Sequence, residues 1–152
     1  MEAKSTRGFT LIELLVVVVI IGIIATVAVP ALITALDRGR QKRTMADLHT
    51  IGVGIQAYVV DTSLYPVGSD IAVLDPLLSG DYIRRLPRTD GWSRPFIYTG
   101  VAGLGYTIGS AGKDGGLSLA LVGNGGATSS LNDDIIFSNG EFVQWPHGAQ
   151  VE

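Results

Sequence analysis

The segment from Arg7 to Leu36 reads RGFTLIELLVVVVIIGIIATVAVPALITAL and decides the fold of this chain. One carboxylate, Glu13, stands near its start, and the 23 residues from Leu14 to Leu36 carry no charged side chain. A helix of that length rises about 35 Å, which is enough to cross a hydrocarbon core of about 30 Å. The segment therefore predicts one membrane-spanning helix. Glu13 adds a single charge near its start, and a charged side chain is costly in lipid.

The order of charged and apolar residues differs from that of a secretory signal peptide. Lys4 and Arg7 precede Gly8, and the apolar stretch follows the glycine. A secretory signal peptide has a shorter apolar region, with a small-residue cleavage site behind it. Cleavage after Ala25 or Ala28 is the alternative of that kind, and the length of the apolar run favours a membrane helix over it.

The composition limits the classes of function. The chain has 152 residues, enough for one modest domain, and a formal charge of -3 without a basic excess that would indicate nucleic acid binding. Cysteine is absent, so a head outside the cytoplasm would need a staple other than a disulfide, such as a metal. Only His49 and His147 offer bases near neutral pH, and no nucleophile elbow or phosphate loop is present, so we expect no enzyme activity.

An amphipathic helix is predicted after the membrane segment. Its apolar face recurs at steps of three and four, through Met45, Leu48, Ile51, Ile55 and Val59. Tyr65-Pro66 should end this helix, because a residue before proline avoids the α region. A short helix is expected over Ala72 to Leu78.

Strand-like runs dominate the C-terminal part. They are Pro95 to Thr99, Gly105 to Ile108, Asp134 to Ser138 and Glu141 to Trp145. Asn139-Gly140 predicts a type I′ hairpin between the last two runs. Gly123 to Ser130 is interpreted as a mobile loop and His147 as part of a frayed tail. The expected class is α+β, with one long helix packed on a small antiparallel sheet.

The Gly8-Phe9…Glu13 pattern, behind a basic leader and before an apolar run, resembles the prepilin signal of type IV pilins and type II secretion pseudopilins. The resemblance implies that a prepilin peptidase cuts between Gly8 and Phe9 and methylates the amino group of Phe9. It also implies assembly through Phe9 and Glu13: the α-amino group of one subunit would meet the Glu13 carboxylate of another, where an unpaired charge is costly. The plainer alternative places Glu13 at the membrane interface.

Pro30 is the third residue that the resemblance connects with assembly. Pilins carry a proline at the matching position, and the helix near it can unwind in the filament. A simple proline kink in a membrane helix is the alternative. We interpret Gly22 to Pro30 as an extensible segment.

Charge counting and the resemblance give opposite orientations. The leader carries few charges, whereas residues 37–43 hold Arg38, Arg40, Lys42 and Arg43, and the positive-inside tendency would place this larger cluster in the cytoplasm. The resemblance implies the reverse, a single-pass protein of the inner membrane with its head in the periplasm. We follow the resemblance, because the motif is more specific than a few charges.

Further motifs resemble the major, G-type pseudopilin of type II secretion in both residues and order. They are Tyr82-Ile83-Arg84-Arg85-Leu86-Pro87, Gly91-Trp92-Ser93-Arg94-Pro95-Phe96, Gly105-Tyr106-Thr107-Ile108, Ser110-Ala111-Gly112-Lys113-Asp114-Gly115 and Asp133-Asp134-Ile135. The resemblance implies four parts: a leader (1–8), an assembly helix (9–36), an amphipathic helix (37–65) and a globular head (66–152).

The function implied by this resemblance is mechanical. Copies of the chain would form a helical homopolymer, a periplasmic fibre that helps to export folded proteins. The implied partners are the prepilin peptidase, minor pseudopilins, an inner-membrane assembly platform and membrane lipid. The alternative within the same superfamily is a type IV pilus pilin, whose surface fibre serves adhesion or motility.

Asp114, Asp133 and Asp134 look like the calcium-binding loop of G-type pseudopilins, so the resemblance implies a Ca²⁺ site, with Ser110 as a further oxygen ligand. Ca²⁺ takes roughly six to eight oxygens from carboxylates and carbonyls. The alternative is a plain turn at Asp114 and a strand start at Asp133. The family pattern brings the acidic residues close together, whereas 17 residues, Gly116 to Asn132, intervene in this chain. A bulged loop would preserve the site; otherwise it is lost.

Overall fold

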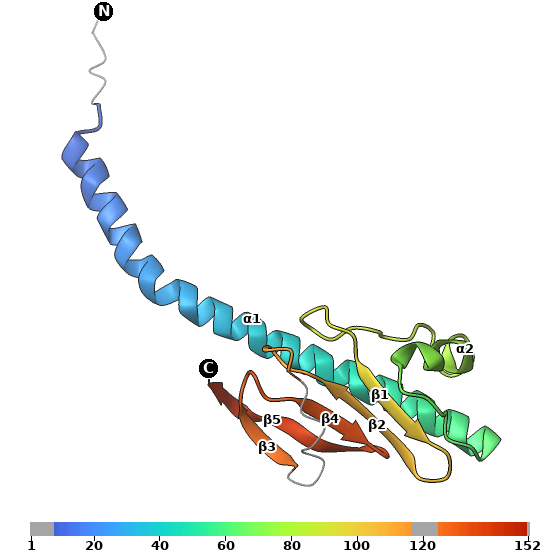
Figure 1. Cartoon of the computed structure of the whole chain (residues 1–152). Coiled ribbons are helices and arrows are strands. Elements are labelled where there is room, and N and C mark those ends of the chain that lie inside the picture. Colours follow the sequence, from blue (N-terminus) through green and yellow to red (C-terminus); the bar gives the residue numbers. More distant parts are fainter. Residues whose placement is uncertain (1–7, 117–124, 152) are drawn as a thin grey trace, which may run out of the picture. The chain divides into compact units, whose positions relative to one another are not determined.

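The computed structural model describes residues 8–116 and 125–151, without the side chains of 149–151 (Figure 1). The leader residues 1–7 and residues 117–124 of the predicted insertion lie outside the described residues. The chain divides into two compact units, Met1–Leu36 and Asp37–Glu152.

Helix α1 (Leu11–Thr62) begins in the first unit and continues into the second. Pro30 lies inside α1 without ending it, and the Thr34 hydroxyl donates to the Pro30 carbonyl at 3.2 Å. Large apolar side chains of the first unit lie exposed; Ile24, for example, is 62 % exposed. Among the described residues, α1 is the one helix that is long and apolar enough to cross a membrane. Lipid or other helices must therefore cover this segment.

The second unit contains a five-stranded sheet in the order β1-β2-β4-β5-β3. The strands are β1 (Ile97–Val101), β2 (Gly105–Ser110), β3 (Gly126–Ser130), β4 (Ile135–Ser138) and β5 (Glu141–Val151). Neighbouring strands run antiparallel except β3 and β5, which are parallel. The α+β class predicted from the sequence is confirmed, with one parallel pair at the edge of the sheet.

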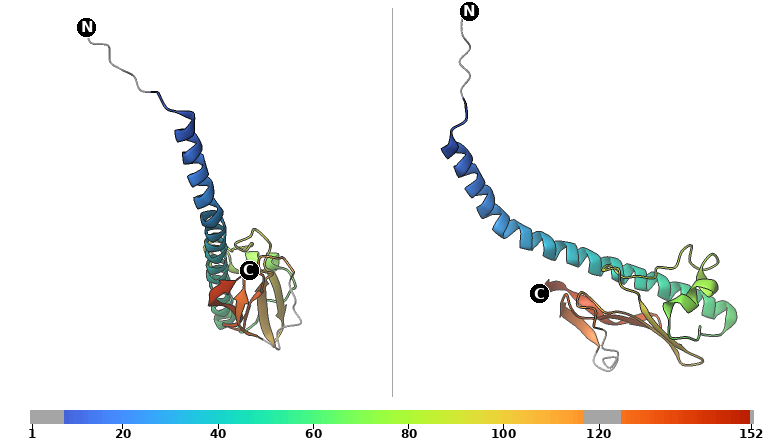
Figure 2. Two further views of the ribbon diagram at one scale, coloured as in Figure 1. Left: turned by 90° about the vertical axis from the view of Figure 1, so that its left-hand side faces the viewer. Right: turned by 45° about the horizontal axis from the view of Figure 1, so that its top comes forward.

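The second part of α1 supplies the helix side of the core. Leu48, Ile51 and Ile55 are fully buried, and Met45 and Val59 pack against the same cluster. The sheet side of the cluster includes Tyr98, Tyr106, Ile108, Ile135 and Phe137. Both views in Figure 2 show the sheet along this part of the helix. The predicted apolar face is therefore confirmed.

Two glycines let the helix approach its neighbours closely. A Cβ atom on Gly52 would lie 2.1 Å from Cε1 of Phe137, and one on Gly54 would lie 2.4 Å from Cδ1 of Ile83. The Tyr106 hydroxyl donates to the Gly52 carbonyl at 3.3 Å, which ties the helix to β2. Glycine lowers the helix propensity at these two positions. In return, the absence of a side chain lets the helix pack closely against Phe137 and Ile83.

The predicted short helix and hairpin are both present. A 3₁₀ turn, η1 (Ile71–Leu74), leads into α2 (Asp75–Leu78). Asn139 and Gly140 have φ angles of 49° and 98°, the pair of positive values that a type I′ turn requires. This turn joins β4 to β5 and pairs Ser138 with Glu141.

Two expectations about the C-terminal part were wrong. Residues 126–130, interpreted as part of a mobile loop, form the edge strand β3, and His147 lies in β5 instead of a frayed tail. The residues of β3 are small or hydroxylated, so this edge strand lacks the apolar alternation that sequence analysis detects. Because β3 pairs with β5 as far as Val151, β5 is longer than its apolar residues indicate.

Candidate functional site

The first turn of α1 holds reciprocal hydrogen bonds between Thr10 and Glu13. The N–H and the hydroxyl of Thr10 donate to Glu13 Oε2 at 2.8 and 2.7 Å, and the N–H of Glu13 donates to Thr10 Oγ1 at 3.3 Å. This is a capping box, which satisfies donors that a helix start leaves unpaired. Thr-x-x-Glu is the sequence signature of such a box, so the role of Thr10 could have been predicted from the sequence.

The capping box accounts for the Glu13 carboxylate within a single chain. Its negative charge lies in the first helical turn, where the helix dipole favours it. Phe9 precedes this turn and is 78 % exposed. Pairing of Glu13 with Phe9 of another subunit stays a prediction, as do cleavage after Gly8, methylation of Phe9 and extension near Pro30.

The acidic residues expected to bind calcium lie on two segments that the fold brings together. The backbone N–H of Lys113 donates to the Leu131 carbonyl at 3.2 Å. A Cβ atom on Gly112 would lie 2.7 Å from the carbonyl oxygens of both Asn132 and Asp133. The turn after β2 therefore lies against the start of β4, although the predicted insertion separates them in sequence.

The carboxylates of Asp114 and Asp133 accept hydrogen bonds from backbone groups within their own turns. Asp114 is exposed and accepts from the N–H of Gly116 at 3.0 Å, within its own turn. Asp133 accepts from the N–H of Ser130 at 3.1 Å. Asp134 is buried, at 5 % exposed.

Ser110 belongs to a different cluster, centred on the buried carboxylate of Asp90. The Ser110 hydroxyl donates to Asp90 Oδ2 at 2.7 Å. Asp90 Oδ1 accepts from the backbone N–H groups of Trp92 and Arg94, both at 2.9 Å. Asp90 therefore fastens the turn before β1 to the end of β2.

The surroundings of these positions bear on whether they could hold a calcium ion. Among the described residues, no three carboxylate or histidine side chains converge as metal ligands. The Arg94 guanidinium already donates to the Gly112 carbonyl, at 2.6 Å. A cation bound to one oxygen of the loop disfavours a divalent ion beside it. Calcium binding by Asp114, Asp133, Asp134 and Ser110 stays a prediction.

A second cation ties the same turn to α1. Lys113 Nζ lies 3.2 Å from Asp37 Oδ2, and Arg40 Nη1 lies 2.8 Å from Asp37 Oδ1. Asp37 is only 2 % exposed. Burial would raise the pKa of Asp37, but the hydrogen bonds from Lys113 and Arg40 and the charge of Lys113 outweigh burial and hold the pKa below its usual value.

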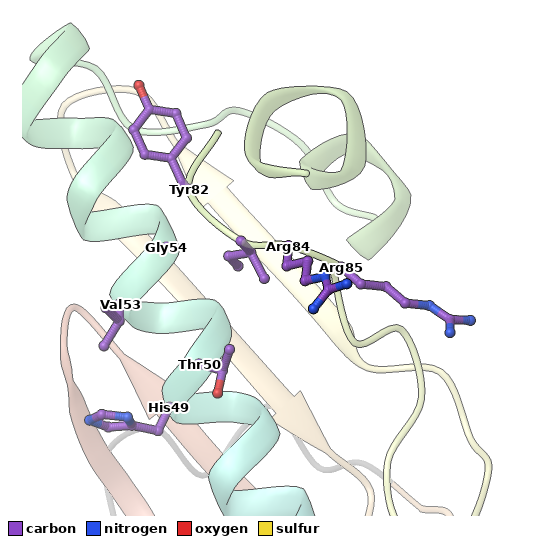
Figure 3. A pocket seen from close by; sticks show the side chains of 8 residues that line it. His49, Thr50, Val53, Gly54, Tyr82, Arg84 and Arg85 are labelled. Carbon is purple, nitrogen blue, oxygen red and sulfur yellow. The ribbon is translucent and has the colours of Figure 1, made fainter. Parts of the chain in front are cut away.

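A shallow groove on the head lies between α1 and the segment before β1 (Figure 3). It is lined by His49, Thr50, Val53, Gly54, Tyr82, Ile83, Arg84 and Arg85. His49 also packs edge-on against Phe137, with ring centroids 6.2 Å apart. Arg84 and Arg85 are exposed at one side of the groove, so this surface combines apolar contact area with positive charge.

Comparison with known protein families first defines the class of this chain. Residues 3–29 match the family model described as the prokaryotic N-terminal methylation motif. Together with the apolar first unit, this match places the chain among proteins with a pilin-like N-terminal signal. Residues 31–120 match the model described as type II secretion system (T2SS), protein G. The chain belongs to the type II secretion system protein G family and is a pseudopilin.

Curated relatives agree along most of the chain. A type II secretion system core protein G from Vibrio cholerae is 33 % identical over 129 residues, covering 76 % of this chain and 88 % of the relative. Proteins with the same description from Pseudomonas aeruginosa and Klebsiella pneumoniae are 31 % and 33 % identical, covering 76 % and 87 % of this chain and 92 % and 94 % of the relatives. The resemblance found in the motifs is confirmed, and type II secretion is favoured over a type IV pilus.

Proposed function

We propose that this chain is a structural subunit of a type II secretion pseudopilus that assembles through its N-terminal helix. The observation that carries the proposal is the continuity of α1 from Leu11 to Thr62. One helix thereby combines a membrane-length apolar segment with the buried face that supports a protein G head. The family match over residues 31–120 supports the same role.

The exposed apolar segment supports storage in lipid followed by transfer to a fibre. In the membrane pool, acyl chains would cover the side chains of residues 14–36. In the fibre, the same side chains would pack against neighbouring helices. Because both environments are apolar, the transfer leaves the hydrophobic burial nearly unchanged, so polar groups such as Glu13 decide the register of assembly.

Processing is the first step of the proposed pathway. A prepilin peptidase would cut between Gly8 and Phe9 and methylate the new amino group, a proposal supported by the methylation motif over residues 3–29. Intact-mass analysis of the membrane-extracted protein tests this step. We expect a chain that begins at Phe9 and carries one additional methyl group. Retention of residues 1–8 in cells with an active prepilin peptidase would contradict it.

The proposed location and partners follow from this role. The unassembled subunit would cross the inner membrane once, with its head in the periplasm, and would meet an assembly platform and minor pseudopilins there. Its contribution would be mechanical, without catalysis of its own. The assignment of the family to structural pseudopilins supports this.

Gene deletion and complementation test the function. We expect deletion to leave secreted proteins in the periplasm of the parent organism, and the wild-type gene to restore export. A variant without residues 1–36, which keeps the head but loses the apolar first part of α1, should not restore export. Normal secretion in the deletion strain, accompanied by loss of a long surface fibre or of motility, would favour the type IV pilus instead.

A further inference from the structure

Two cations of this chain lie at the loop where the family resemblance implies calcium. The Arg94 guanidinium donates to the Gly112 carbonyl at 2.6 Å, across 18 positions of sequence. A Cβ atom on Gly115 would lie 2.7 Å from Cζ of Arg94, so the guanidinium lies directly against this turn. Gly115 has a φ of 81°, a conformation that glycine adopts without strain. The turn is therefore shaped around the guanidinium.

Arg94 is itself held in place from the opposite side. Its backbone N–H donates to Asp90 Oδ1 at 2.9 Å, and Asp90 is 4 % exposed. The other oxygen of Asp90 accepts from the Ser110 hydroxyl at 2.7 Å. The buried carboxylate of Asp90 thus holds both Arg94, which supplies the cation, and Ser110, the first residue of the loop.

Lys113 supplies the second positive charge, on the helix side of the loop. Its side chain is two-thirds covered, and its ammonium group lies 3.2 Å from the buried Asp37 carboxylate of α1. Its backbone N–H bonds to the Leu131 carbonyl on the far side of the predicted insertion. A single residue therefore connects the loop to α1 and to the segment before β4.

We propose that Arg94 and Lys113 hold the loop of residues 110–116 closed in place of a bound calcium ion, so that the head of this pseudopilin is stable without calcium. The two side-chain cations and two buried carboxylates, Asp37 and Asp90, tie the loop to α1 and to the turn before β1. The backbone N–H of Lys113 ties it to the segment before β4. A divalent ion beside the Gly112 carbonyl would face repulsion from the guanidinium already bonded there. The carboxylates of Asp114 and Asp133 instead cap their own turns.

Thermal unfolding of the full chain in detergent tests this inference. Both tryptophans of the chain, Trp92 and Trp145, lie in the second unit, so their fluorescence reports on the head. We expect the wild-type protein to melt at the same temperature in millimolar calcium and in chelator. Calorimetric titration of the wild-type protein with calcium chloride should show no binding in that range, a measurement that needs no variant.

Substitutions separate the two cations from the acidic residues. Arg94→Gln and Lys113→Gln should each lower the melting temperature by about 3 °C or more, equally in calcium and in chelator. Arg84→Gln removes an exposed arginine and should change nothing measurable. A wild-type head that melts higher in calcium would overturn the inference, and loss of that gain in Asp133→Ala would assign the ion to the predicted site. Equal melting of the Arg94→Gln and Arg84→Gln proteins would also overturn it.

Discussion

The two units of the molecule use apolar residues in opposite ways. In the first unit, side chains such as Ile24 are more than half exposed, whereas Leu48, Ile51 and Ile55 in the second unit are fully buried. Both sets belong to one helix, α1. The described residues of the first unit, 8–36, form no buried core, so lipid or other subunits must cover their apolar side chains. In the head, the sheet covers the apolar side chains of the helix.

This difference predicts which property each substitution will change. A change in the first unit should alter assembly and leave the melting of the head intact. A change in the second unit should alter the melting of the head, and assembly only as a consequence. A substitution in the first unit that lowers the melting temperature of the head would contradict this division. So would a substitution in the second unit that abolishes assembly without changing the melting of the head.

The largest effect is expected from Glu13→Ala in the first unit. Membrane insertion should persist or improve, because the substitution removes a charge from an apolar segment. Fibre assembly should be lost, because the amino group of Phe9 in the neighbouring subunit no longer meets a carboxylate in low dielectric. Electron microscopy and shearing of fibres from cells that overproduce the system would measure this loss.

Glu141→Ala is the matched control, since it removes an exposed carboxylate from the head. It should assemble as the wild-type protein does. Both variants should show wild-type melting of the head. A normal yield of fibres from the Glu13→Ala protein would show that the carboxylate has no role in assembly.

The next effect is expected from Gly52→Ala in the second unit. The added methyl group would overlap the buried Phe137 ring, and overpacking of this kind costs about 2 kcal/mol of the free energy of unfolding. Gly39→Ala is the control in the same helix, because a Cβ atom there meets nothing within 4 Å. It should stabilise the helix by about 0.5–1 kcal/mol. Denaturant unfolding should give opposite signs for the pair, and equal signs would contradict the packing.

A smaller effect, which depends on pH, is expected from Asp37→Asn. The pKa of Asp37 lies below its usual value in the folded state, so the stability that its charge provides is present above about pH 4 and is lost as the pH falls through the folded pKa. Near neutral pH the variant should be less stable by about 1.5 kcal/mol, because it loses charged hydrogen bonds with Lys113 and Arg40. Melting curves from pH 7 down to pH 3 should show this gap closing. A gap that stays constant would mean that the carboxylate charge is not responsible.

Most of the fold was predictable because its signals are periodic or local. Three patterns each predict their structure from neighbouring residues alone. They are the charge-free run, the helix face through Leu48 and Ile51, and the Asn139-Gly140 turn. The edge strand β3 was missed because its stability comes from pairing with β5 and not from its own apolar residues. The close approach of Gly52 to Phe137 also depends on tertiary packing. The sequence therefore shows a glycine that weakens the helix, but it does not show the aromatic ring that requires a glycine there.

The candidate sites divide in the same way. The signal at Gly8, Phe9 and Glu13 is local, and the methylation motif recognised over residues 3–29 agrees with it. The surroundings of the acidic loop depend on partners distant in sequence. Asp90 and Arg94 were not identified beforehand, because a bond from Arg94 to Gly112 is visible only once β1 and β2 are paired. The protein G match ends at residue 120, ahead of Asp133 and Asp134.

The smallest effect is expected from Gly22→Ala in the first unit. This substitution tests whether the helix opens locally between Gly22 and Pro30. A Cβ atom on Gly22 meets nothing within 4 Å, so the substitution adds no clash and removes only the conformational freedom of glycine. Local opening of the helix should become harder by about 1 kcal/mol, which slows amide hydrogen exchange over residues 22–30 about fivefold. Mass spectrometry of the subunit in detergent would measure this exchange, and Gly39→Ala, which strengthens the same helix beyond the apolar run, should leave these amides unchanged. Unaltered exchange in the Gly22→Ala protein would mean that Gly22 does not soften the helix, and the extensible segment would then have to depend on Pro30 alone.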